Sequence, residues 1–208
     1  MTIQHKFWDR IAGLYARTPV ADEAAYQAKL EKSREYFTKD SKIFEFGCGT
    51  GSTAINHAPY ARNILAIDVS GKMIEIARDK AAAKGIDNVR FEVCTIEDYD
   101  GPVENFDVVM AHSILHLVKD RGAVISKARA LLKPGGIFIS STICIGDSII
   151  GRTIGMTASV FSLVGLLPYI NNVTSEMLVN SIEKAGFNLE HEWRPKKNSA
   201  LFLIARKA

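Results

Sequence analysis

Short apolar runs that alternate with helical patterns are the feature of this 208-residue chain that most restricts its fold. Each run is only a few residues long and rich in Ile, Val or Phe, as expected for strands that are buried on both faces. The runs are residues 43–46, 64–67, 89–94, 106–111 and 137–142. Strands that alternate with helices predict a parallel sheet joined by crossover helices.

Capping and stop residues set the expected helix boundaries. Ser70 begins a helix that Gly85 ends, and Asp120 begins a second one that closes at the turn of residues 133–136. Thr174 or Ser175 begins a third, which ends at Gly186. Two further strands, 188–193 and 200–205, are joined by a short loop, which predicts an antiparallel hairpin at the end of the sheet.

Two segments lie outside this alternation. Residues 1–40 are expected to be helical, because Phe7, Trp8, Ile11 and Leu14 have helical spacing. Residues 143–173 are apolar and glycine-rich, and no charge occurs from 153 to 170, the length of a membrane span. Pro168 and the position between strands of one sheet oppose a span. We expect a helical lid over an apolar acceptor pocket; a homodimer surface is the alternative.

Composition supports one globular domain over residues 1–208. Apolar residues make up 47% and charged residues 24% of the chain, and the net charge is only +3 with no block of like charges. We therefore expect no nucleic-acid partner. The N-terminus has no signal-like apolar run, which favours the cytoplasm. Three cysteines, Cys48, Cys94 and Cys144, are far apart and form no CxxC pair, so no disulfide framework or metal site is predicted.

A glycine cluster follows the first apolar run, and residues 44–51 read Phe-Glu-Phe-Gly-Cys-Gly-Thr-Gly. Glycines between a strand and a helix let a ligand approach the backbone closely. A nicotinamide-binding fingerprint, GxGxxG, would need a glycine at position 52. Ser52 stands there, and Gly51 comes one residue early. An NAD(P)-dependent oxidoreductase is therefore the less favoured interpretation.

With Glu45 before this loop, the chain resembles the class I S-adenosylmethionine-dependent methyltransferases. Asp68 after the second run, the Phe106-Asp107-Val108-Val109 strand and the turn at 131–136 match further motifs of the family in order. Within this family, the chain resembles small-molecule enzymes such as those of ubiquinone and menaquinone biosynthesis. The resemblance implies a Rossmann-like, doubly wound α/β fold whose seven-stranded sheet is mostly parallel with an antiparallel last strand. It also implies S-adenosylmethionine as the cofactor.

The resemblance assigns cofactor contacts to this sequence. Asp68 is expected to bind both ribose hydroxyls, because a carboxylate has two acceptor oxygens and a diol has two donors. Glu45 is expected at the ammonium end of the cofactor, and Tyr15, on a helical segment that covers the cofactor, near its carboxylate. The full set is Tyr15, Glu45, Gly47, Cys48, Gly49, Gly51, Asp68, Met73, Thr95, Ile96, Glu97 and Ala111.

Some of these assignments remain open. Many relatives have an aspartate for the adenine amino group where this chain has Thr95. The adenine is then bound by Thr95, by the backbone at Ile96 or, if the loop is shifted, by Glu97. Met73 is either helix core or a neighbour of the adenine. The three cysteines lie near strand ends, where a soft ion is one interpretation and small buried hydrophobes are the favoured one.

The acceptor side has fewer signals. The methyl donor is already activated, so the protein must mainly align the reactants. His112 is a candidate general base with His116 about one helical turn further on; a histidine that packs beside the pocket is the alternative. Residues 111–114 read Ala-His-Ser-Ile, not the Asn-Pro-Pro-Tyr of enzymes that methylate exocyclic amines. We expect a small, apolar or aromatic acceptor, with a non-catalytic cofactor-binding relative or partner subunit as the other possibility.

Overall fold

A computed structural model describes residues 3–148, 151, 153, 169–196 and 199–208 of the chain. Most of the predicted lid at 143–173 therefore lies outside the described residues. Within that segment the structure describes a short 3-10 helix, η2 (Ile145–Asp147). Among the helices that the structure describes, none combines the length and the hydropathy that a membrane span requires.

The sheet has seven strands in the order β3-β2-β1-β4-β5-β7-β6. Neighbours from β3 to β5 are parallel, and β7 is antiparallel to both β5 and β6. The predicted fold class is therefore confirmed, including the hairpin at the end of the sheet. The strands are β1 (Lys42–Phe46), β2 (Asn63–Asp68), β3 (Val89–Val93), β4 (Phe106–His112), β5 (Leu132–Thr142), β6 (Phe187–Trp193) and β7 (Leu201–Lys207).

Six α-helices and two 3-10 helices are described. The predicted caps hold: side-chain oxygens of Ser70, Asp120 and Thr174 each accept a hydrogen bond from an amide in the first turn of the following helix. The helices are α1 (Ile3–Arg17), α2 (Glu23–Arg34), α3 (Ser52–His57), η1 (Ala58–Tyr60), α4 (Gly71–Ala83), α5 (Arg121–Leu131), η2 and α7 (Ser175–Lys184).

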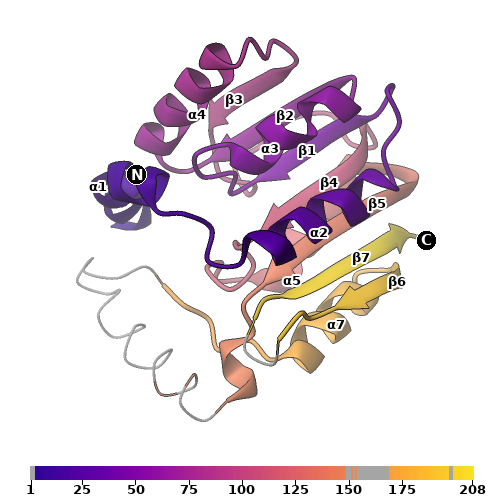
Figure 1. Cartoon of the computed structure of the whole chain (residues 1–208). Helices are drawn as coiled ribbons and strands as arrows, with labels where there is room; N and C mark the ends of the chain where they lie inside the picture. The colour runs from indigo at the N-terminus through magenta and orange to yellow at the C-terminus, as the bar shows by residue number, and fades with distance from the viewer. Residues whose placement is uncertain (1–2, 149–150, 152, 154–168, 197–198) are drawn as a thin grey trace.

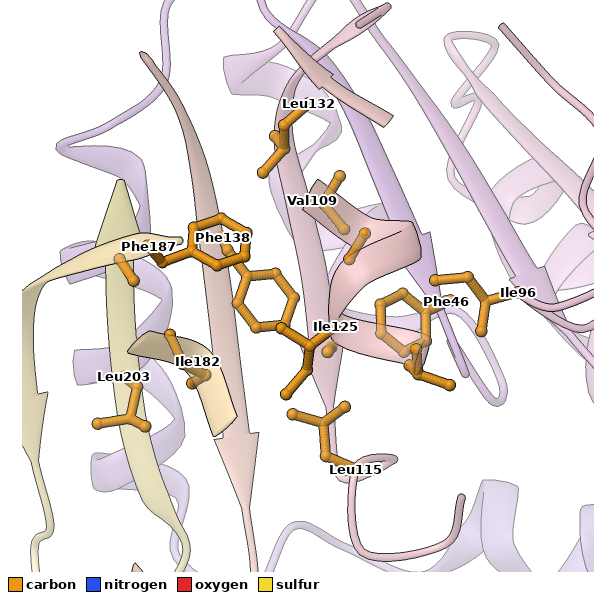
Figure 2. Packing of buried hydrophobic residues seen from close by; sticks show 14 of the residues in the cluster. Phe46, Ile96, Val109, Leu115, Ile125, Leu132, Phe138, Ile182, Phe187 and Leu203 are labelled. Atoms are coloured by element: carbon orange, nitrogen blue, oxygen red, sulfur yellow. The ribbon is translucent and has the colours of Figure 1, made fainter. Parts of the chain in front are cut away.

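Apolar side chains cover both faces of the sheet, as a doubly wound fold requires. On one face the strands pack against buried residues of α3 and α4, such as Ile55 and Ile74. On the other face they pack against α5 and α7; Figure 2 shows Ile125 and Ile182 from these helices beside Phe138 of β5. Figure 1 shows α2 and α3 on the side of the sheet opposite α5.

One sequence expectation needs correction. The segment 133–136 was expected to be a turn, but α5 passes into β5 at Leu132, which pairs with Phe106 before the register shifts. Pro134 and the glycines that follow it occupy this irregular start of the strand, where a missing donor is tolerated. Leu14 belongs to α1, as the helical spacing predicted, and it is 73% exposed.

Candidate active site

The strand order reverses between β1 and β4, and ligands of open α/β sheets bind at the carboxyl ends of strands at such a point. The glycine loop leaves β1 at this edge. Gly47, Gly49 and Gly51 all have positive φ angles, of 66°, 54° and 75°, which explains glycine at each position.

The three glycines differ in what surrounds them. A Cβ atom at Gly47 would lie 2.7 Å from Ile114 Cγ1, and one at Gly51 would lie 2.7 Å from the Phe91 ring. These two glycines therefore allow close packing. A Cβ atom at Gly49 would meet nothing nearer than the Tyr15 ring at 3.8 Å. Gly49 thus leaves space beside the backbone, as a ligand-binding loop requires.

Asp68 ends β2 and is bound to this loop. Its Oδ2 accepts a hydrogen bond from the Gly49 amide at 2.8 Å, and its Oδ1 accepts one from the Ser70 amide at 2.9 Å. Burial raises the pKa of Asp68, although these amide donors oppose the shift. Each oxygen keeps further acceptor capacity, so the carboxylate can hold the loop and also accept from a diol.

Glu45 lies one strand away and is almost completely buried, with 1% of its surface exposed. An amide donor at Ala54 reaches the carboxyl, but its Oε2 has no partner in the described part of the protein. Burial, with a smaller contribution from the charge of Asp68, raises the pKa of Glu45 to about 8. A buried acceptor without a partner is costly, and an ammonium group is a partner that would ionise it.

The N-terminal helices bring two phenols to these carboxyls. Burial raises the pKa of Tyr15, and the charges of Asp68 and Glu45 act in the same direction. Tyr26 on α2 accepts a hydrogen bond from Asn56 Nδ2 at 3.2 Å and also lies within the field of Glu45. Tyr15 was predicted at this place, whereas Tyr26 was not.

Asp9 of α1 ties this covering helix to the start of α4. Its Oδ1 accepts from Ser70 Oγ at 2.6 Å and from the Lys72 amide at 3.1 Å. Burial acts to raise the pKa of Asp9, but the two hydrogen bonds and the charges of His5 and Lys72 lower it overall. Ser70 therefore joins Asp9 to Asp68, and α1 is anchored next to the glycine loop.

The residues predicted around the adenine differ in how far they are buried. Thr95 Oγ1 is used in a local turn, donating to Asp98 Oδ2 at 2.9 Å and accepting from the Asp98 amide at 3.1 Å. Ile96 is buried beside Phe46 (Figure 2), and Glu97 is exposed. Met73, Cys48 and Ala111 are buried, with exposures of 2%, 9% and 0%.

The predicted histidine lies at the carboxyl end of β4. His112 pairs in register with Ser141 of β5, and its Nε2 is inaccessible and has no partner among the described residues. Burial, aided by the charge of Lys29, lowers the pKa of His112 to about 4. Burial likewise lowers the pKa of His116 to about 4. Both imidazoles are therefore neutral at pH 7.

Lys29 was not predicted as a site residue. Its Nζ donates a hydrogen bond to Ser141 Oγ at 2.8 Å, although the two residues are 112 positions apart in the sequence. The available signal was its spacing: Tyr26, Lys29 and the buried Leu30 and Ser33 share one face of α2.

The three cysteines do not gather into a binding site in the described part of the chain. Burial raises the pKa of the Cys48 and Cys144 thiols, and no group of three metal-binding side chains is found in the described ranges.

Comparison with known proteins agrees with this geometry. Residues 37–191 match the family described as "Methyltransferase domain". The crystal structure of YcgJ from Bacillus subtilis superposes with a TM-score of 0.72 at 15% identity, covering 87% of this chain and 98% of that one, which shows a shared fold.

Three curated relatives match parts of the sequence. The chain is 29% identical over 100 residues to the uncharacterized methyltransferase YcgJ of Bacillus subtilis, 33% over 98 to a tRNA 5-carboxymethoxyuridine methyltransferase of Escherichia coli, and 32% over 102 to a ubiquinone biosynthesis O-methyltransferase of Bradyrhizobium. These matches cover 48%, 46% and 49% of this chain. They cover 40%, 38% and 40% of the relatives, so the chain spans less than half the length of each.

The chain therefore belongs to the methyltransferase domain family, the class I S-adenosylmethionine-dependent methyltransferases that its motifs resemble. This confirms the family predicted from the sequence. The residues present also fit that cofactor, because a buried carboxyl oxygen without a partner and an open glycine face lie at the same strand edge.

Proposed function

We propose that this protein methylates a small molecule by in-line transfer at the carboxyl ends of β1 and β4. The observation that carries the proposal is Glu45, a buried carboxyl with one oxygen left without a partner beside the open face of Gly49. The sulfonium of S-adenosylmethionine supplies an activated methyl group. The protein's task is then to bind, orient and exclude water.

The protein's own residues divide this task. Glu45 binds the ammonium end of the donor, and Asp68 binds its ribose while holding the Gly49 amide. Tyr15 covers the loop from α1, which the Asp9–Ser70 hydrogen bond fixes in place. Thr95, Ile96, Glu97 and Met73 form the adenine side. In this proposal α1 and α2 act as the N-terminal lid.

The acceptor meets the donor next to His112. A neutral imidazole can take a proton, although a pKa of about 4 makes it a weak base for a hydroxyl group. A small acceptor is favoured because Ser141, at the end of β5, is buried where Lys29 of α2 contacts it. The E. coli relative acts on tRNA, which makes a nucleoside in tRNA the second candidate acceptor.

The test measures release of S-adenosylhomocysteine from S-adenosylmethionine in the presence of phenols, quinols, small carboxylic acids or unmodified tRNA. Turnover with a small molecule supports the proposal, and turnover with tRNA alone contradicts it. Binding of the donor with no turnover on any acceptor would favour the non-catalytic alternative. With an acceptor in hand, His112→Ala should lower kcat about 100-fold if His112 is a general base, and His116→Ala should not.

A further inference from the structure

Lys29 is a partly buried ammonium group that has no carboxylate within ion-pair distance in the described part of the chain. Its Nζ donates a hydrogen bond to Ser141 Oγ. Asp22 is the acid whose charge acts on Lys29, but Asp22 is paired with Lys196 Nζ at 2.7 Å. Burial lowers the pKa of Lys29.

The position of Lys29 places it on the acceptor side. Ser141 is the register partner of His112 at the carboxyl ends of β4 and β5, and its carbonyl accepts a hydrogen bond from the Ser113 amide at 2.7 Å. Ser113 has a positive φ of 55°, so the chain turns sharply away from the sheet directly after His112. An ammonium, a hydroxyl and a neutral imidazole therefore gather at this edge.

A single neutral hydroxyl is a poor substitute for the water that a buried ammonium loses. Lys29 has two further N–H donors, and Ser141 Oγ, which accepts from Lys29, still has its own proton to donate. An anionic oxygen placed between them would accept charge-assisted hydrogen bonds from both groups. His112 adds no competing positive charge, because its imidazole is neutral.

We propose that Lys29 and Ser141 form a subsite for an anionic oxygen of the methyl acceptor, either a phenolate or a carboxylate. This inference rests on the proposed function, because it concerns the acceptor of that reaction. It specifies the acceptor further: an aromatic molecule with an ionised oxygen is bound in preference to a neutral analogue.

The subsite has a defined role if the bound oxygen is the one that is methylated. The acceptor hydroxyl loses its proton to solvent on binding, and Lys29 stabilises the resulting oxyanion and keeps its own proton. The oxyanion then forms a bond to the methyl carbon while the carbon–sulfur bond breaks and its electron pair stays on sulfur. Negative oxygen and positive sulfonium both become neutral, so charge balances. A carboxylate elsewhere on the acceptor would instead anchor it.

The experiment uses the full chain saturated with S-adenosylhomocysteine and two probe pairs. Benzoate is compared with benzamide by calorimetry, and 4-nitrophenol is compared with nitrobenzene, with the visible absorbance of the phenolate reporting its ionisation when bound. The variants are Lys29→Met, Lys29→Arg and, as a control on the same helix, Lys32→Gln. Affinity for S-adenosylhomocysteine and thermal unfolding verify that each variant is folded.

We expect at least one anionic probe to bind about tenfold or more tightly than its neutral partner. Lys29→Met should remove this preference, whereas Lys29→Arg and Lys32→Gln should keep it. Ionisation of bound 4-nitrophenol at lower pH than in solution identifies the reacting oxygen as the anion; preference for benzoate alone identifies an anchoring carboxylate. No binding of any probe, equal binding within both pairs, or a preference that survives in Lys29→Met overturns the subsite. Failure to bind S-adenosylhomocysteine contradicts the proposed function instead, and the probes then test the subsite on the ligand-free protein.

Discussion

The Asp68 carboxylate accepts a hydrogen bond from the backbone amide of Gly49 at 2.8 Å, across the carboxyl ends of β1 and β2. The residue expected to bind the ribose is thus also the residue that holds the centre of the glycine loop. Its second oxygen accepts from the Ser70 amide, and Ser70 is bound in turn to Asp9 of α1. Loop, strand end and covering helix form one hydrogen-bonded unit.

Replacement of Asp68 should therefore affect binding of both the donor and the product. Asp68→Ala is expected to weaken affinity for S-adenosylmethionine and S-adenosylhomocysteine by about 2–4 kcal/mol, because charge-assisted hydrogen bonds are lost. Calorimetry measures both affinities. Asp87→Ala, an exposed carboxylate before β3, serves as the control and should bind normally. Unchanged affinity in Asp68→Ala would contradict the assignment of this residue to the ribose.

Alanine substitutions at Gly49 and Gly51 should have different effects: the first should mainly weaken donor binding, and the second should mainly lower the stability of the fold. Gly51→Ala places a methyl group 2.7 Å from the Phe91 ring and 2.8 Å from Ala77 Cβ, so it should destabilise the fold by about 2–4 kcal/mol. Gly49→Ala has room for its methyl group and should cost only about 1–2 kcal/mol of stability for the backbone conformation. Its methyl group enters the open space below Tyr15, so donor binding should be lost.

Urea unfolding gives the stability of each glycine variant, and calorimetry at a temperature where both are folded gives the affinity. Our assignment of Gly49 to ligand approach would be wrong if Gly49→Ala bound the donor as tightly as the wild type does.

Local sequence signals predicted the parts of the protein that depend on neighbouring residues. Ser70, Asp120 and Thr174 cap helices as expected, because a cap needs only an amide two or three residues ahead. The glycine loop and Asp68 were recognised from motif order. By contrast, the Lys29–Ser141 contact joins residues 112 positions apart, and no local pattern specifies which strand a helix covers.

Other features also depend on more than the local sequence. The Thr95 hydroxyl, which is predicted to lie on the adenine side, is also used in a local turn, where it donates to Asp98 Oδ2 and accepts from the Asp98 amide. Glycine and proline at 134–136 predicted a turn, but the pairing of Leu132 with Phe106 starts β5 before them. Tertiary pairing decided that boundary.

Glu45 should make stability fall as pH rises. Its pKa is about 8 in the folded protein and near 4.5 as the ordinary value, so the folded state binds the additional proton between these values. The contribution of Glu45 to the free energy of unfolding of the ligand-free protein should therefore decrease between about pH 4.5 and 8, and above pH 6.5 the buried histidines no longer oppose this decrease. Glu45→Gln should remove most of this decrease, whereas exposed Glu97→Gln should keep it.

The same carboxyl should release a proton when the donor binds. At pH 7 the free protein holds Glu45 protonated, and an ammonium partner favours the ionised form. Calorimetric titrations in two buffers of different ionisation enthalpy measure the proton count. Release of a proton by wild type but not by Glu45→Gln is expected; equal counts would exclude Glu45 from the ammonium site.

His57 should limit stability in acid. Both of its ring nitrogens are buried without partners in the described residues, and burial, with the charges of His112 and Arg34, lowers its pKa from 6.5 to about 3. The stabilising neutral form is complete above pH 6.5 and is lost as pH falls towards 3. The free energy of unfolding, measured with urea, should therefore fall less below pH 6.5 in His57→Leu than in the wild type. The difference should be on the order of 2 kcal/mol or more. His5→Gln should leave the loss unchanged, and a His57→Leu curve that matches wild type would refute this origin of acid sensitivity.

We propose that the loop from Gly47 to Gly51, with Glu45 and Asp68, binds S-adenosylmethionine and not a nicotinamide dinucleotide. Calorimetric titration of the purified full chain with S-adenosylmethionine and, separately, with NADP tests this claim most directly. We predict saturable binding of S-adenosylmethionine at one site per chain and no binding of NADP. Binding of NADP, or no binding of S-adenosylmethionine by the folded protein, would contradict this assignment of the loop.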